Sequence, residues 1–204
     1  MRTIFFDLGG VLVNFSHEKM CQNIAHFCGL NLDLVKAHLF EKNLEEDYER
    51  GQIDSHTIHQ HFMQLAKRPL DFDGLLEAAS SIFSPKEEML PILEELKKQE
   101  ISLFLLSNTC EAHFWYVQKH YPFLKLFDGF VLSYEVKARK PEEAIYDAAL
   151  EMSGAHKSQC FYVDDIAEYV AAAKSYGIDS YQFEDAEKLT AALEKRDINI
   201  TRNL

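Results

Sequence analysis

The sequence has no long hydrophobic run and no excess of positive charge. No apolar stretch approaches the roughly 20 residues that a membrane-spanning helix needs, and the first residues lack the basic region and cleavage site of a signal peptide. Lysine and arginine number 21 against 33 aspartates and glutamates, a formal net charge of −12. Because nucleic-acid binding depends on clustered Lys and Arg, this balance argues against a nucleic-acid partner. We therefore expect a cytoplasmic protein that binds neither membranes nor nucleic acid.

Cysteine is also sparse, and its spacing excludes the common metal and disulfide frameworks. No Cys-x-x-Cys pair occurs among Cys21, Cys28, Cys110 and Cys160, so we expect four reduced core residues. What the sequence does have is material for a core, since 47% of its 204 residues are hydrophobic and 12% are aromatic. This length fits one domain, or one domain with an insertion.

Short apolar runs alternate with amphipathic stretches over most of the chain. We expect strands at 3–6, 101–106, 129–132, 160–163 and 179–183, and helices at 86–99, 111–120, 141–152, 166–176 and 186–194. Strands that alternate with helices of this length imply right-handed crossovers. The pattern predicts an α/β fold with a doubly wound parallel sheet and helices on both of its faces.

The segment 15–84 differs from the rest, because its pattern is helical throughout. Met20, Ile24 and Phe27 repeat at helical spacing, and so do Ile58 and Phe62. A last helix is expected at 71–83, ending before a proline. We predict a core built from 1–14 and 85–204, with the small helices of 15–84 inserted after the first strand.

The beginning of the sequence holds the first candidate site. A strand predicted to be buried ends there at Asp7, and two glycines, Gly9 and Gly10, follow closely. An acid in this place lies at the carboxyl edge of the sheet, where open α/β sheets bind ligands. Glycines there let backbone N–H groups approach an anion such as phosphate. By itself, the stretch also fits an ordinary Asp-initiated turn. Its interpretation therefore depends on partners elsewhere in the chain.

Those partners are polar residues that the same fold brings to the same edge. They are Ser107, Asn108 and Thr109 after the second core strand, Asp164 and Asp165 after the fourth, and Lys140 before a helix. Carboxylates hold Mg²⁺, while a hydroxyl and an ammonium bind phosphate oxygens. A carboxylate can also attack phosphorus directly. The set as a whole suits phosphoryl transfer, although each member alone is a common turn or surface residue.

With these residues in place, the chain resembles the haloacid dehalogenase-like hydrolase superfamily over nearly its whole length. Four segments are similar to its four motifs, in order: 6–12 (FDLGGVL), 105–109 (LLSNT), 133–141 (SYEVKARKP) and 162–165 (YVDD). The insertion resembles the superfamily's small helical cap, and 48–54 (YERGQID) is similar to a segment often seen in such caps. The branch that it most resembles contains the alpha-D-glucose-1-phosphate phosphatases and the phosphatase domain of bifunctional epoxide hydrolases.

The resemblance implies a Rossmann-like core and a Mg²⁺-dependent phosphatase that acts on a small phosphorylated metabolite, a sugar phosphate first of all. Asp7 would be the nucleophile and would form an aspartyl-phosphate, with Ser107 and Lys140 binding the phosphoryl oxygens. Asp165 would bind Mg²⁺ directly and Asp164 through a water. The carboxylate of Asp7 and the carbonyl of Gly9 would also bind the metal. The substrate-binding residues would be Leu8, Gly9, Asn108 and Thr109.

Two alternatives stay open. One is a dehalogenase that uses the same Asp7 without a metal. The other is a non-catalytic relative that keeps the fold to bind a phosphate ligand or a partner.

The chain departs from the superfamily's usual pattern at two positions. Gly9 stands where phosphatases of this superfamily usually carry a second Asp, the general acid and then base. Loss of a general acid typically costs about 10²–10⁴-fold in rate, so we expect good leaving groups to be favoured, unless His17 or Glu18 supplies the proton. Tyr169 stands where an Asn commonly occurs, which alters the surroundings of the metal.

Overall fold

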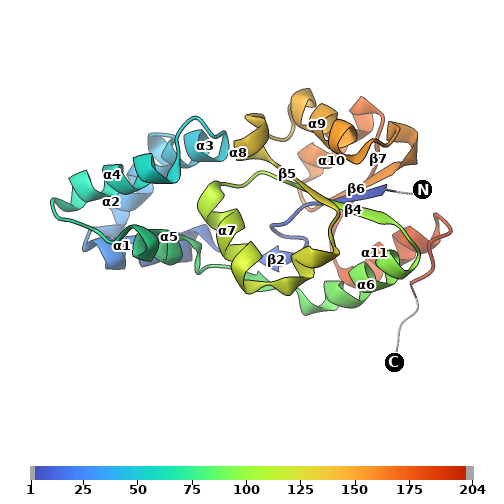
Figure 1. Ribbon diagram of the computed structural model, residues 1–204, viewed down its shortest axis with the longest axis horizontal. Helices are drawn as coiled ribbons and strands as arrows, with labels where there is room; N and C mark the ends of the chain where they lie inside the picture. The colour runs from blue at the N-terminus through green and yellow to red at the C-terminus, as the bar shows by residue number, and fades with distance from the viewer. Residues whose placement is uncertain (1–2, 201–204) are drawn as a thin grey trace.

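The computed structural model describes residues 3–200, and a parallel sheet of five strands forms its centre (Figure 1). The strand order is β5-β4-β1-β6-β7. Their bounds are β1 Thr3–Phe6, β4 Ser102–Ser107, β5 Gly129–Leu132, β6 Cys160–Asp164 and β7 Asp179–Gln182. All four pairings between neighbouring strands are parallel. The predicted α/β fold is therefore confirmed.

Side chains that alternate along β1 divide the core into two layers. Ile4 and Phe6 pack with α6 (Leu90–Lys98), α7 (Glu111–His120) and α11 (Ala186–Glu194), whereas Phe5 packs toward α9 (Glu143–Ser153) and α10 (Ala167–Tyr176). Figure 1 shows α9 and α10 on one face of the sheet and α6 and α11 on the other. Burial of each such side chain contributes about 1.5–3 kcal/mol, which explains why these strands are apolar on both faces.

The sheet reverses its order at β1, and this reversal fixes the position of the site. β1 pairs with β4 through Phe6 and Leu105, and with β6 through Phe6 and Val163. The residues that follow these strands therefore meet at one edge. In open α/β sheets the ligand site forms at such a reversal, outside the carboxyl ends of the strands.

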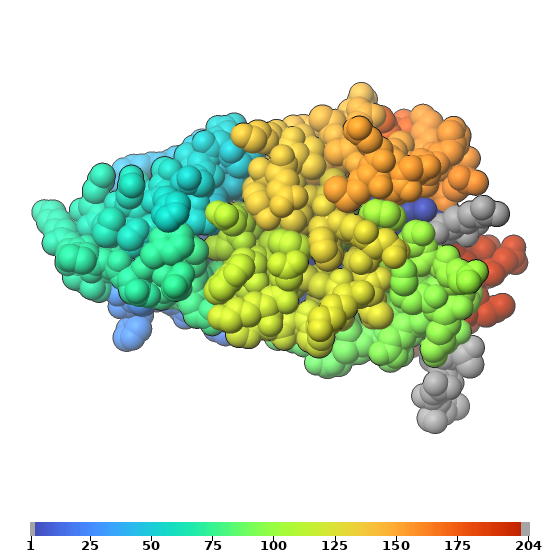
Figure 2. Space-filling view, viewed as in Figure 1, coloured from blue at the N-terminus to red at the C-terminus, as the bar shows by residue number. Residues whose placement is uncertain are grey.

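The helical insertion forms a second body, which we call the cap (residues 15–84). Its elements are α1 His17–Cys28, α2 Leu32–Lys36, the π-helical turn η1 Ala37–Glu41, α3 Leu44–Glu49, α4 Ser55–Ala66 and α5 Phe72–Ser80. Met20, Phe62 and Leu75 belong to a second buried cluster, to which Cys110 and Ala112 at the start of α7 also contribute. Two short antiparallel strands, β2 Val13–Asn14 and β3 Ser84–Pro85, join it to the sheet domain. Figure 2 shows the cap packed against the segment that contains α7 and α8 (Ser133–Val136).

Some helices end elsewhere than the sequence indicates. The helix expected at 71–83 stops at Ser80, because the chain turns there: the Ile82 N–H donates to the Ser80 carbonyl at 2.7 Å and Ile82 packs back into the cap. The helix expected from 86 begins as a 3-10 turn, η2 Glu87–Met89, and α6 then starts with Pro91 in its first turn, where its missing N–H costs nothing. Two further 3-10 turns, η3 Pro122–Leu126 and η4 Lys157–Gln159, precede strands.

All four cysteines are buried and none is in a disulfide over residues 3–200, so the prediction that they are core residues is confirmed. Over residues 3–200, every helix is too short or too polar to span a bilayer.

Candidate active site

The turn after β1 holds Asp7 at the edge of the sheet. The Asp7 carboxylate accepts a hydrogen bond from the Leu8 N–H at 2.7 Å, and the Val13 N–H closes the turn onto the Leu8 carbonyl at 3.0 Å. Gly10 has φ = 74°, and a β-carbon there would overlap the Asp165 carboxylate. The glycine that this turn requires for its backbone is therefore Gly10, whereas Gly9 has no positive φ.

Three carboxylates meet above this turn. Asp7, Asp164 and Asp165 each offer an oxygen, and these oxygens lie within 4.8 Å of one another. An all-oxygen donor set of this kind fits a hard divalent cation, which would be held by Asp7 and Asp165 with Asp164 behind them. The oxygens of Asp164 are already engaged: one accepts the Ile166 N–H at 2.8 Å, and the other accepts the Tyr162 hydroxyl and the Lys140 ammonium. Asp7 and Asp165 are therefore the more available ligands.

Lys140 lies between two of these carboxylates and is only 3% exposed. Its Nζ is 2.9 Å from an oxygen of Asp7 and 2.6 Å from an oxygen of Asp164. Burial raises the pKa of Asp7 to about 7, and the charge of Lys140 opposes this rise. Burial also acts to lower the pKa of Lys140, but the two carboxylates outweigh it and hold that pKa above its usual value. The ammonium therefore stays charged and favours an ionised Asp7.

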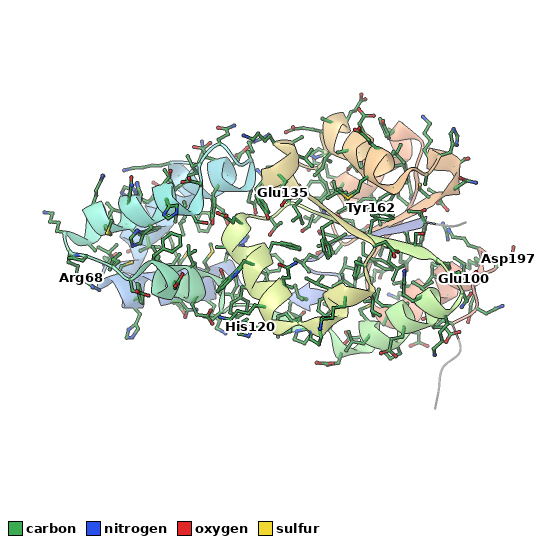
Figure 3. The ribbon with its side chains drawn as sticks, in the orientation of Figure 1. Arg68, Glu100, His120, Glu135, Tyr162 and Asp197 are labelled. Atoms are coloured by element: carbon green, nitrogen blue, oxygen red, sulfur yellow. The ribbon has the colours of Figure 1, made fainter. Side chains whose placement is uncertain are left out.

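Asn108 fixes the backbone that carries this lysine. Its side-chain amide donates to the Lys140 carbonyl at 3.1 Å and accepts from the Lys140 N–H at 2.8 Å. The same amide donates to the Tyr169 hydroxyl at 3.4 Å, and the Tyr169 ring lies 5.1 Å from the Lys140 Nζ. The amide of Asn108 thus positions Lys140, and Tyr169 covers the ammonium from the side. Tyr162, which donates to Asp164 from β6, lies at the centre of the core (Figure 3).

Ser107 is the last residue of β4, Thr109 lies two residues beyond it, and both are buried. The Ser107 hydroxyl lies at the pocket, 3.4 Å from the Asn108 carbonyl, to which it donates. The N–H of Thr109 donates to the Ser133 hydroxyl at 2.9 Å, and that hydroxyl reaches the carbonyls of Thr109 and, at 2.7 Å, of Glu49 in the cap. Ser133 therefore links the phosphate-site loop to the cap.

These groups open into a cavity of about 180 Å³ between core and cap. Eight of its lining residues were predicted as site residues: Asp7, Leu8, Gly9, Ser107, Asn108, Thr109, Lys140 and Asp165. The ninth predicted residue, Asp164, lies beneath the cavity at 0% exposure. The other lining residues are Phe15, His17, Glu49, Phe83, His113, Arg139, Ile166 and Tyr169. Of the two proposed proton donors, His17 lines the cavity, whereas the Glu18 carboxylate is 53% exposed and pairs with Lys36 at 2.6 Å.

Ion pairs join α3 of the cap to the core beside Lys140. Arg139 contacts Glu46 at 3.3 Å and Glu49 at 2.9 Å. In the opposite direction, Arg50 of the cap contacts Glu142 of the core at 2.7 Å. Sequence patterns could not indicate these contacts, because they join segments about 90 residues apart through side chains that look like ordinary surface charges.

The comparisons with known proteins bear on this geometry. The family model for the haloacid dehalogenase-like hydrolases matches residues 1–177. The chain belongs to this family. Among curated relatives, the sesquiterpene phosphatase of Aspergillus oryzae is 24% identical over 97% of this chain and 96% of its own length. The D-ribitol-5-phosphate phosphatase of Bacteroides thetaiotaomicron is 24% identical over 91% of this chain and 93% of its own.

A solved structure of the same family is also similar to this chain. It is a single-residue mutant of a haloacid dehalogenase family enzyme from Bacteroides thetaiotaomicron, in complex with magnesium and inorganic phosphate. Its TM-score is 0.79 at 26% identity, and the match covers 93% of this chain and 98% of that one. The predicted superfamily is thus confirmed, and the chain is a hydrolase of that family by descent.

Proposed function

We propose that the protein is a Mg²⁺-dependent phosphatase that hydrolyses a small phosphate monoester through an aspartyl-phosphate on Asp7. The observation that carries the proposal is the contact between Asp7 and Lys140, 2.9 Å apart in a buried pocket that also holds Asp165. It pairs a nucleophile with a fixed positive charge where a phosphoryl group would arrive. That two relatives are named phosphatases supports the same reaction.

In the first half-reaction, an oxygen of Asp7 attacks phosphorus and the ester oxygen departs. The Ser107 hydroxyl and the Lys140 ammonium bind the phosphoryl oxygens, whose charge spreads in the transition state. In the second half-reaction, water attacks the phosphorus and frees Asp7. Asn108 contributes indirectly, because its amide sets the position of the Lys140 backbone. A Mg²⁺ ion would be held by Asp7, Asp165 and the Gly9 carbonyl, and it would neutralise phosphate charge. Its positive charge, like that of Lys140, would also stabilise the ionised form of Asp7.

The polar part of the cavity wall suits a small polar substrate. The cavity has a volume of about 180 Å³, and it is lined by Glu49 and His17 of the cap and by Arg139 of the core, which together offer hydrogen-bond donors and acceptors. Hydroxyl groups next to a phosphate would find partners there. We therefore propose sugar and polyol phosphates as the substrate class, and the relative named for ribitol phosphate supports this choice.

The test is phosphate release from a panel of sugar, polyol, acyl and aryl phosphates, with Mg²⁺ and with a chelator. We expect turnover that requires Mg²⁺ and that vanishes in Asp7→Asn, a variant that keeps the shape of the side chain but not its charge. Halide release from 2-haloacids without metal would instead identify a dehalogenase. If the protein binds phosphate or vanadate but turns over no substrate, it is a non-catalytic relative. Lys140→Met should weaken vanadate binding if the ammonium contacts the phosphoryl group.

A further inference from the structure

The cap contributes a carboxyl group, that of Glu49, to the wall of the cavity that Asp7 also lines. Glu49 is the last residue of α3, and it lines the same cavity as Asp7, Ser107 and Lys140. Its side chain is only 15% exposed. The cap therefore contributes an acid to a site whose own loop carries Gly9 at the position where phosphatases of this superfamily usually have one.

Contacts from the core hold Glu49 in this place. One of its carboxylate oxygens lies 2.9 Å from Arg139, the neighbour of Lys140 in the chain. Its backbone carbonyl accepts the Ser133 hydroxyl at 2.7 Å. Two residues later, Gly51 passes so close to the Tyr134 carbonyl that a β-carbon would overlap it. Both the backbone and the side chain of Glu49 are thus fixed relative to the phosphate site.

The surroundings of Glu49 also allow it to hold a proton near neutral pH. Burial raises its pKa to about 7, against the opposing charge of Arg139. Glu45 adds to the rise, whereas His17 and Lys140 act in the same direction as Arg139. A general acid works best when its pKa lies near the working pH, and Arg139 is placed to stabilise the carboxylate that remains after the proton has left.

We propose that Glu49 is the proton donor of this hydrolase, in the role that Gly9 cannot fill. The inference rests on the proposed phosphatase function. As the Asp7 oxygen bonds to phosphorus and the bond from phosphorus to the ester oxygen breaks, the Glu49 proton passes to that oxygen, which leaves as an alcohol. In the second half-reaction the Glu49 carboxylate takes a proton from the attacking water, and the Asp7 carboxylate and phosphate are released.

His17 is the other titratable cap residue at the cavity, and its contacts suit the role less well. Its side chain is 51% exposed, and its Nε2 lies 3.4 Å from an oxygen of Glu45. Its ring packs against the rings of Phe15 and Phe40, with centroids 5.1 and 5.9 Å away. The ring is therefore held at the rim of the cavity, whereas Glu49 is enclosed and tied to the core.

The experiment compares Glu49→Gln with Glu46→Gln. Glu46 is a matched control, since it lies on the same helix, also contacts Arg139 at 3.3 Å, and is not among the residues that line the cavity. The measurement is alcohol release in a single turnover, over phosphate esters whose leaving groups range from nitrophenol to primary alcohols. This readout isolates the step in which the proton is donated.

We expect Glu49→Gln to slow primary alkyl phosphates by about 10²–10⁴-fold and to leave nitrophenyl phosphate nearly unchanged, because nitrophenolate departs without a proton. The dependence of rate on leaving-group pKa should be steep in Glu49→Gln and shallow in the wild type and in Glu46→Gln. With alkyl esters, the wild-type rate should also fall above about pH 7 as Glu49 ionises, and Glu49→Gln should lack this decline.

Equal losses with all leaving groups, or parallel slopes in the two variants, would overturn the assignment. A steep slope that appears with His17→Asn in place of Glu49→Gln would transfer the role to His17. A wild type that releases no phosphate from any ester would contradict the proposed function instead, and the two failures are therefore distinguishable.

Discussion

The ring of Phe15 lies over Gly9, with its Cε1 atom 2.8 Å from the place where a β-carbon of residue 9 would be. The ring also packs against Phe83, at a centroid distance of 6.3 Å, and is 43% exposed. The absence of a side chain at residue 9 is therefore matched by an aromatic ring that occupies the space.

This contact determines how an acid could be restored at residue 9. Gly9→Asp alone has to displace the Phe15 ring and should lower the free energy of unfolding by about 1 kcal/mol. Gly9→Asp combined with Phe15→Ala gives the carboxylate room and should increase the rate with alkyl phosphates, most of all when Glu49→Gln is also present. Thermal unfolding and phosphate release should be measured for both single variants and the combinations. If Phe15→Ala leaves the cost of Gly9→Asp unchanged, the ring is not the obstacle.

The two neighbouring aspartates at the end of β6, Asp164 and Asp165, should respond differently to substitution. Asp165→Ala should reduce Mg²⁺ affinity by about tenfold or more by calorimetry, because it removes one of the two most available carboxylates. Asp164→Asn should mainly reduce stability, since Asp164 is buried and bonds to Lys140, Tyr162 and the Ile166 N–H. Unchanged Mg²⁺ affinity in folded Asp165→Ala would contradict this division of roles.

The close approach of cap and core at Gly51 should make the free energy of unfolding sensitive to a side chain at this position. Gly51 and Gly29 both have positive φ, of 62° and 69°. A β-carbon would overlap the Tyr134 carbonyl at Gly51 but meets no atom within 4 Å at Gly29. We expect Gly29→Ala to cost about 1 kcal/mol and Gly51→Ala roughly 2–4 kcal/mol, as measured by urea unfolding. Equal costs would mean that the cap can shift away from α8 without loss.

His113 should make stability depend on pH. Burial lowers its pKa from 6.5 to about 4 in the folded protein. As the pH falls from 6.5 toward 4, the unfolded chain binds a proton there that the folded protein does not, so stability is lost over this range, by about 3 kcal/mol in total. Wild type and His113→Gln should be compared by denaturant unfolding at pH 7 and pH 4.5. The advantage of the wild type should shrink at the lower pH, and a constant difference would show that His113 does not titrate as described.

The sequence predicts the core of the fold well, for a physical reason. The central strands β1, β4 and β6 are short apolar runs, and a polar residue such as Asp7 or Asp164 stands at the end of the run, so the centre of the sheet and its functional edge are both encoded locally. Helix ends were less predictable. The helix from 71 stops at Ser80, because Ile82 gains more from packing into the cap than from continuing the helix.

The cap side of the site could not be predicted in the same way. Glu49 and Arg139 look like surface charges, and only the folded chain brings them to 2.9 Å. Asn108 lines the cavity, and its amide also bonds to the backbone of Lys140, 32 residues away, a contact that no sequence pattern indicates. Two signals were available: the segment 48–54, which lies where the cap meets the core, and His17, which lines the cavity.

The ion pairs between cap and core have a consequence for how such enzymes can be recombined. An exchange of residues 15–84 for the same segment of another family member would remove Glu46, Glu49 and Arg50 together, and would leave Arg139 and Glu142 facing foreign side chains. The hybrid would therefore lose the ion pairs of Arg139 and Glu142, next to Lys140, as well as the cap residues that line the cavity. In this protein, a transplanted cap therefore has to be introduced together with a matching stretch of the core, from Arg139 to Glu142.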